Sequence, residues 1–110
     1  MKMCKTASMI GLAMKAGKIS SGEYQTEESV KKGKAFFVII ASDASDNTKK
    51  KFQNMCDFYE VEAISKYTKE ELGQMIGREN RACLAINDSG FAQSIKKKLQ
   101  LMAQESMEEL

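Results

Sequence analysis

The sequence predicts an α/β fold, a three-layer α/β/α sandwich in which helices cover a sheet of four strands. Segments with apolar residues at helical spacing alternate along the chain with short apolar runs rich in β-branched residues. Glycines fall at the boundaries expected between these segments, and the chain contains no proline. With 110 residues the chain can bury a sizeable core, so residues 1–110 are expected to form a single domain.

A first helix is expected over residues 3–15, because four apolar residues recur there at helical spacing and Gly17 follows as a terminator. Those four residues are Met3, Ala7, Ile10 and Met14. Residues 18–20 are too few to stand alone and are expected to form a brief edge strand before a turn at Gly22.

A second helix is expected over residues 23–32, ending at Gly33. Within it, only Val30 and the methyl group of Thr26 offer apolar surface at helical spacing. A helix with so little to bury usually presents its start or its outer face to solvent or to a partner. Its start is marked by the Ser-Ser-Gly of residues 20–22, where capping hydroxyls and a glycine would leave backbone N–H groups pointing outward for an anion.

The most apolar segment of the chain, residues 35–41, is a continuous run of aromatic, β-branched and small residues. Such a run is typical of a strand that is covered on both faces, so this segment is expected at the centre of the sheet. A helix over residues 46–59 and a strand over residues 61–65 are expected to follow.

Thr68 and Glu71 have the spacing of a capping box, which predicts a short helix that ends at Gly77. The apolar residues 82–86 are then expected to form the last buried strand.

The final helix is expected to begin with a cap at Asp88 or Ser89. Its C-terminal part is expected to fray over the acidic tail, residues 103–110. The apolar side of this helix is predicted to consist of Phe91, Ile95, Leu99 and Met102.

The composition argues against most enzyme classes. The chain has no histidine, which removes the usual base of serine and cysteine hydrolases and the commonest metal ligand. Cys4, Cys56 and Cys83 are odd in number and contain no close pair, so neither a disulfide framework nor a zinc site is expected. We interpret them as reduced core thiols and expect no cofactor and no metal.

Lysines interrupt the apolar N-terminus, and no run approaches the ~20 residues that span a bilayer. A soluble, cytoplasmic protein with no membrane partner is therefore expected. The net charge is only +2, but residues 1–20 hold four lysines and no acid. A near-neutral total can hide a basic face in this way.

Asp43, Ser45 and Asp46 follow the central strand, where open α/β sheets tend to bind ligands. The two acids could hold Mg²⁺, or Asp43 could accept a phosphoryl group. The other interpretation is that one of the three caps the next helix and the others decorate the turn. Capping is favoured, because no lysine-bearing end of a later strand completes a phosphoryl site, and an enzyme is not expected.

Two polar loops remain as candidate binding segments, residues 20–25 and residues 77–81. The arginines of the second loop suit phosphate and guanine recognition, and Gln25 can present both a donor and an acceptor to base edges. Tyr24 could stack on an unpaired base. These features favour RNA binding; a protein-interaction module and ordinary solvated turns are the alternatives.

An ordered set of short motifs runs through the chain: Gly17-Lys18, Ser21-Gly22 with Gln25-Thr26, Gly33-Lys34-Ala35 with the strand after it, Cys56, Tyr59-Glu60-Val61, residues 68–73, Ile76-Gly77 and residues 82–86. Together these motifs resemble the L-seven-Ae type ribosomal protein family. The resemblance covers about residues 4–95, and the small ribosomal-like members from Gram-positive bacteria are the most similar.

This resemblance implies a four-stranded mixed sheet and binding to kink-turn RNA, an internal loop bent sharply beside tandem sheared G·A pairs. In the family, a Gly-x-Asn-Glu-x-x-Lys pattern at the start of the second helix reads the guanines in the major groove. Gly22 matches this pattern, whereas Tyr24, Gln25 and Glu28 replace its asparagine, glutamate and lysine. The family's other contact is the loop before the last strand, which is polar here, so stacking or pairing by arginine would replace apolar burial of a flipped-out nucleotide.

The resemblance predicts a non-catalytic protein whose partner is structured RNA, such as a kink-turn or ribosomal RNA. A monomer is expected because no surplus apolar stripe is visible in the sequence. The alternative is a protein-interaction module of the same fold, docked on ribosome or transcription machinery, which Glu28 and the acidic tail favour. Lys15 is expected to help neutralise phosphates. The residues predicted to form the RNA site are Lys18, Ser21, Gly22, Glu23, Tyr24, Gln25, Lys32, Lys34, Arg78, Glu79, Asn80 and Arg81.

Overall fold

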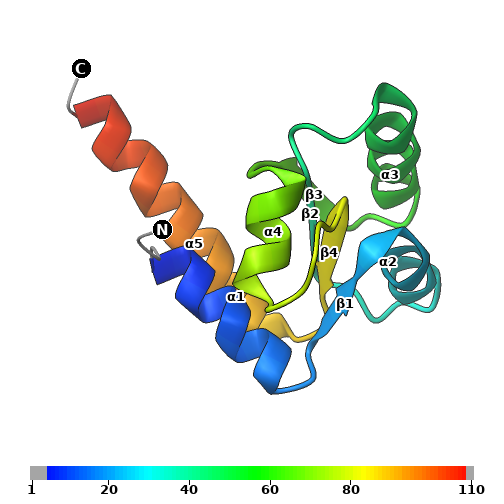
Figure 1. Cartoon of the computed structure of the whole chain (residues 1–110), viewed down its shortest axis with the longest axis horizontal. Coiled ribbons are helices and arrows are strands. Elements are labelled where there is room, and N and C mark those ends of the chain that lie inside the picture. Colours follow the sequence, from blue (N-terminus) through cyan, green and yellow to red (C-terminus); the bar gives the residue numbers. More distant parts are fainter. Residues whose placement is uncertain (1–4, 109–110) are drawn as a thin grey trace.

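The computed structural model of the chain describes the backbone of residues 5–108 and the side chains of residues 6–100 (Figure 1). Helices and strands alternate along this part of the chain. The elements are α1 (Lys5–Lys15), β1 (Ile19–Ser21), α2 (Gly22–Lys31), β2 (Phe37–Ile40), α3 (Asp46–Phe58), β3 (Glu62–Ser65), α4 (Lys69–Met75), β4 (Cys83–Ile86) and α5 (Ser89–Glu108).

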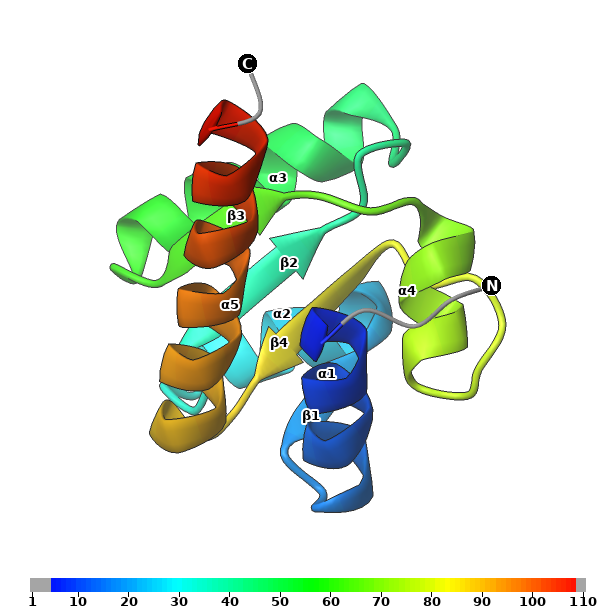
Figure 2. The ribbon, with the colours of Figure 1, turned by 90° about the vertical axis from the view of Figure 1, so that its left-hand side faces the viewer.

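The four strands form one mixed sheet in the order β1-β4-β2-β3. Strands β2 and β3 are parallel, whereas β4 runs antiparallel to both of its neighbours. Helices α1, α4 and α5 lie on one face of the sheet, and α2 and α3 lie on the other (Figure 2). The predicted three-layer α/β/α sandwich with a four-stranded mixed sheet is therefore confirmed.

The core is built on the two inner strands, β2 and β4, in which every residue is buried. This confirms the prediction that residues 35–41 contain a central strand and that residues 82–86 contain a buried one. A large aliphatic side chain at such a position typically costs about 2–5 kcal/mol when it is cut back to alanine. The inner strands are consequently the rigid part of the fold from which the loops at their ends project.

Most helix boundaries agree with the sequence prediction to within one or two residues. Helix α5 continues to Glu108. Met3 and Met102 belong to the predicted apolar stripes of the first and last helices. Met3 and the side chain of Met102 lie outside the described residues.

Side-chain caps define the starts of three helices. Thr68 and Glu71 form the predicted capping box at the start of α4. At the start of α5, the N–H of Phe91 donates to the carboxylate of Asp88 across 2.9 Å, so Asp88 rather than Ser89 is the cap. Ser45 caps α3 by accepting from the N–H of Thr48. Such caps typically stabilise a helix by about 1 kcal/mol each.

Cys56 and Cys83 are free thiols and are buried, which confirms their prediction as core residues. Burial raises the pKa of each of these thiols to about 11. Both are therefore neutral packing groups rather than nucleophiles. Cys4 lies outside the described residues.

Within the described part of the chain, no helix is long and apolar enough to cross a membrane.

Candidate functional site

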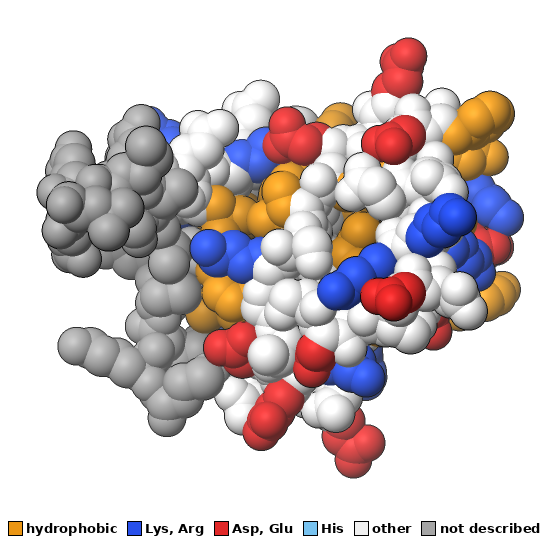
Figure 3. Space-filling view, turned by 90° about the horizontal axis from the view of Figure 1, so that it is seen from above, with side chains coloured by type: hydrophobic (Ala, Val, Ile, Leu, Met, Phe, Trp, Pro, Cys, Tyr) orange, Lys and Arg blue, Asp and Glu red, His pale blue; other side chains and the backbone are white. Residues whose placement is uncertain are grey.

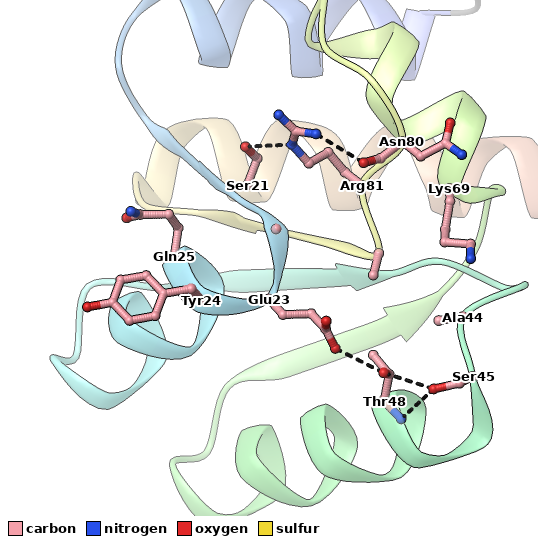
Figure 4. Close-up of a pocket in the computed structure, with 12 residues that line it drawn as sticks. Ser21, Glu23, Tyr24, Gln25, Ala44, Ser45, Thr48, Lys69, Asn80 and Arg81 are labelled. Atoms are coloured by element: carbon pink, nitrogen blue, oxygen red, sulfur yellow. Dashed lines mark hydrogen bonds between the residues drawn. The ribbon is translucent and has the colours of Figure 1, made fainter.

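The start of α2 and the loop before β4 meet at one pocket of about 610 Å³, although 60 residues separate them in the chain (Figure 4). Ser21 at the end of β1 and residues 22–25 of α2 line it on one side, and Asn80 and Arg81 line it from the loop. The sequence places these two segments in one predicted site. The structure brings them together because β1 and β4 are paired neighbours, with Ser21 opposite Leu84.

The start of α2 has no side-chain cap. Gly22 has a φ of +87°, a left-handed conformation that glycine adopts without strain. Ser21 occupies the N-cap position, but its side chain makes no capping hydrogen bond; instead its Oγ accepts from Nε of Arg81 across 3.4 Å. The prediction that hydroxyls cap this helix is thus wrong, because Ser21 is used to join the loop to the helix. The first N–H groups of α2 keep their partial positive charge at the pocket.

Five further residues line the pocket that are not among the predicted site residues: Ala44, Ser45, Thr48, Lys69 and Ala82. Oγ of Ser45 donates to Oγ1 of Thr48, which donates to a carboxylate oxygen of Glu23, each across 2.9 Å. These two hydrogen bonds connect the start of α2 to the start of α3 and engage the carboxylate of Glu23. The sequence predicts a capping residue among Asp43, Ser45 and Asp46. It does not predict the link from Ser45 through Thr48 to Glu23.

Tyr24 and Gln25 are exposed residues of the helix start, as is Glu23, whose carboxylate is bonded to Thr48. Tyr24 is 72% exposed, and Gln25 is also exposed. Both project outward from the first turn of α2, on the side away from Lys69 (Figure 4). An aromatic ring and an amide are therefore free to meet a partner at the rim of the pocket.

The loop before β4 is fixed against α4. The N–H of Arg78 donates to the carbonyl of Gly73 across 2.8 Å, and the N–H of Arg81 donates to the carbonyl of Lys69 across 3.1 Å. A Cβ on Gly73 would lie only 2.1 Å from the carbonyl oxygen of Glu79. The loop can approach this closely only because residue 73 is glycine.

Arg81 is half-buried and holds its own loop in shape. Its Nη1 donates to the carbonyls of Glu79 and Asn80 across 3.3 and 3.0 Å, in addition to the bond from Nε to Ser21. Arg78 and Glu79 do not line this pocket but a neighbouring groove of about 500 Å³ against α4, which also includes Asn80 and Arg81. The four predicted loop residues therefore divide between two adjoining hollows.

Three predicted lysines lie elsewhere. Lys18 precedes β1, at the end of that strand remote from Ser21. Lys32 and Lys34 follow α2, and a helix of 10 residues spans about 15 Å. The structure therefore does not bring Lys18, Lys32 or Lys34 to the pocket. Lys69 is the pocket's own lysine, and it forms no ion pair with the described side chains.

An ion pair connects α2 to α3. Glu27 accepts from Lys31 at 2.8 Å and pairs with Lys51 of α3 at 2.7 Å. Hydrogen bonds from these two ammonium groups lower the pKa of Glu27 to about 2, and the bond to Glu27 raises the pKa of Lys31. Because both lysines are exposed and Glu27 is only partly buried, the pairs orient the helices more than they stabilise them.

Charges of both signs are mixed over the face of the molecule that Figure 3 shows, with apolar surface between them. Among the described residues, no group of three or more acidic, cysteine or histidine side chains is arranged to hold a metal ion. Asp43 instead accepts from the N–H of Lys69 across 2.8 Å at the start of α4. This contact and the Ser45 cap confirm that the acidic turn after β2 serves helix starts.

A model of the ribosomal protein L7Ae/L30e/S12e/Gadd45 family matches residues 5–96. The chain belongs to this family. It is 42% identical over 93 residues to the RNA-binding protein YlxQ of Enterococcus faecium, covering 84% of this chain and 89% of that protein. It is 36% identical over 87 residues to the RNA-binding protein YlxQ of Bacillus subtilis (strain 168), covering 79% and 87%.

Solved structures of similar fold include a protein of unknown function from Bacillus halodurans C, with a TM-score of 0.83 and 32% identity over 86% of this chain and 96% of that one. The Giardia lamblia 15.5kD RNA binding protein superimposes with a TM-score of 0.71 over 83% of this chain and 78% of that one, at 20% identity. The latter likeness concerns the fold alone.

Glu28 of α2 lies within an ion pair. Its carboxylate pairs with Nζ of Lys32 at 3.2 Å, one turn further along the helix. The negative charge of Glu28 therefore has a positive charge beside it.

Proposed function

We propose that this protein is a non-catalytic RNA-binding protein that binds kink-turn or related structured RNA through the start of α2 and the loop before β4. The observation that carries the proposal is the meeting of these two segments at one pocket, joined by the bond between Arg81 and Ser21. RNA-binding relatives of the same family support an RNA partner.

The pocket offers the chemistry that a bent RNA requires. The uncapped start of α2 favours a phosphate oxygen, and Lys69 adds a positive charge on the opposite wall. Gln25 presents an amide that can pair with a base edge, and Tyr24 presents a ring on which an unpaired base can stack.

Glu28 stands where the family pattern has lysine, and a bare carboxylate there would repel phosphate. Its ion pair with Lys32 offsets this repulsion. The position nevertheless lacks the positive charge that the lysine of the family pattern supplies. We therefore propose binding in which base recognition by Gln25 and contacts from Lys69 and Arg81 contribute more than phosphate contacts along α2. The protein is proposed to act in this way as a cytoplasmic monomer.

A gel-shift experiment tests the proposal with a kink-turn oligonucleotide and a matched one whose tandem G·A pairs are replaced by Watson–Crick pairs. The kink-turn RNA should bind more tightly, and its affinity should fall as salt rises. Gln25→Ala should weaken kink-turn binding by about tenfold, which is the order of one lost base contact. Gln93→Ala, at an exposed position on α5, is the control and should bind as the wild type does. Equal affinity for the two RNAs would refute the proposal.

A further inference from the structure

Helix α2 is attached to the sheet mainly by polar groups. Its buried residues are Thr26, Ser29 and Val30, of which only Val30 is fully apolar. Apolar contacts are non-directional, whereas hydrogen bonds weaken steeply when their angles change. The placement of α2 on the sheet must therefore depend on the hydrogen bonds made at its buried face.

Those hydrogen bonds converge on Asn87, the residue that follows β4. Its Nδ2 donates to Oγ of Ser20 across 2.8 Å, and its Oδ1 accepts from Oγ of Ser29 across 2.5 Å. Its backbone N–H donates to the carbonyl of Lys18 across 2.8 Å. One side chain thus joins the strand that leads into α2 to the last turns of the helix itself.

A further bond closes the arrangement, because Oγ1 of the buried Thr26 donates to the carbonyl of Ser20 across 3.4 Å. Ser20 lies two residues before Gly22, and Ser29 lies seven residues after it. The first turn of α2, which carries Tyr24 and Gln25, is consequently held between two points that are both fixed by Asn87.

We propose that Asn87 is a positioning residue for RNA recognition: through Ser20 and Ser29 it sets the angle at which the first turn of α2 meets the tandem G·A pairs. This inference rests on the proposed function. Asn87 does not line the pocket, so it acts through the helix rather than by touching RNA. Loss of its side-chain bonds should impair the discrimination between RNAs more than general affinity for phosphate.

The experiment compares Asn87→Leu, which keeps the approximate size but removes both side-chain bonds, with Asn87→Asp, whose carboxylate can accept from both serine hydroxyls. For Asn87→Leu we expect kink-turn affinity to fall about tenfold, as for one or two lost hydrogen bonds, while the salt dependence stays that of the wild type. Asn87→Asp should restore much of the preference for G·A over Watson–Crick RNA. Asn54→Leu, at an exposed position on α3, is the matched control.

The amide signals of Gly22 and Glu23 in NMR spectra provide a readout that a loss of stability alone would not move. In folded Asn87→Leu they should shift, and in Asn87→Asp they should return toward their wild-type positions. If Asn87→Leu does not fold, Ser29→Ala and Ser20→Ala remove the two bonds singly and should each reduce the preference for G·A pairs.

Unchanged amide signals, or unchanged discrimination in fully folded variants, would overturn the role of Asn87. The proposed function fails separately, when the wild type itself does not discriminate between the two RNAs. If Gln25→Ala weakens binding but the Asn87 and serine variants do not, only the positioning role is lost.

Discussion

Nε of Arg81 donates a hydrogen bond to Oγ of Ser21, and this bond joins the loop before β4 to the residue that precedes α2. The same guanidinium holds two carbonyls of its own loop. Arginine can do this because its donors are fixed in a plane, whereas a lysine carries one ammonium group. The two halves of the candidate site are therefore coupled through one side chain.

Replacing Arg81 with lysine should weaken kink-turn binding by about tenfold although the charge is kept, because the loop and the helix start would no longer be held together. Affinity measured by gel shift over a range of salt concentrations checks this, and the salt dependence should be nearly unchanged. Arg78→Lys is the matched control, since no side-chain hydrogen bond of Arg78 to a described residue holds the loop. If the two variants bind kink-turn RNA equally well, the guanidinium hydrogen bonds of Arg81 do not contribute to binding.

Gly73→Ala should displace the loop before β4. The new Cβ would meet the carbonyl carbon and oxygen of Glu79, and backbone atoms cannot give way as a flexible side chain does. We expect a loss of about 1–3 kcal/mol in the free energy of unfolding, measured with urea, together with weaker RNA binding.

Gly33→Ala is the control for Gly73→Ala. Gly33 has a φ of +74° with open space around its Cβ position, so alanine there should cost about 1–2 kcal/mol through backbone strain without touching the pocket. RNA binding by folded Gly33→Ala should match the wild type. Should Gly33→Ala reduce binding as much as Gly73→Ala does, the loss would reflect stability rather than the loop.

The sequence predicted the elements well, because each is short and carries its own periodicity or cap. The apolar run that contains β2 and the capping box at Thr68 are examples of such local signals. It did not predict the strand order, in which β4 lies between β1 and β2, because pairing between distant strands leaves no local pattern.

The candidate site was predicted in part for the same reason. The segments around Gly22 and Arg81 are polar and lie at element ends, which local sequence reveals. Lys69 and Thr48 join them only through tertiary packing, so nothing in their neighbours along the chain marks them. Lys32 is predicted to neutralise phosphates, but the length of α2 places it at the opposite end of that helix from Gly22.

Glu27 should make stability depend on pH in the acid range. Its pKa is lowered from 4.5 to about 2 in the folded chain, so its contribution is present above pH 4.5 and is lost as the pH falls toward 2. The urea midpoint of Glu27→Gln should therefore fall less than that of the wild type over this range. Glu70→Gln, at an exposed glutamate without an ion pair to a described residue, should follow the wild type; if Glu27→Gln does so too, its ion pairs do not persist in solution.

Cys56 and Cys83 should resist thiol reagents in the folded protein, because both are buried and burial raises the pKa of each thiol to about 11. A Cys4→Ser variant confines the assay to these two residues. Labelling followed by mass spectrometry should be slow in buffer and should rise with urea in parallel with unfolding. Rapid labelling in buffer would contradict the packing of α3 against the sheet.

The place of β4 in the sheet has a consequence for how the protein is made. Strand β1 pairs with β4 alone, and Asn87, which holds α2, follows β4 directly. A nascent chain that has not yet extended past Asn87 therefore has no partner for β1 and no clamp for α2. Non-local pairing of this kind also slows folding. The candidate site should accordingly be among the last parts of the molecule to form, so a partly synthesised chain would not yet present it.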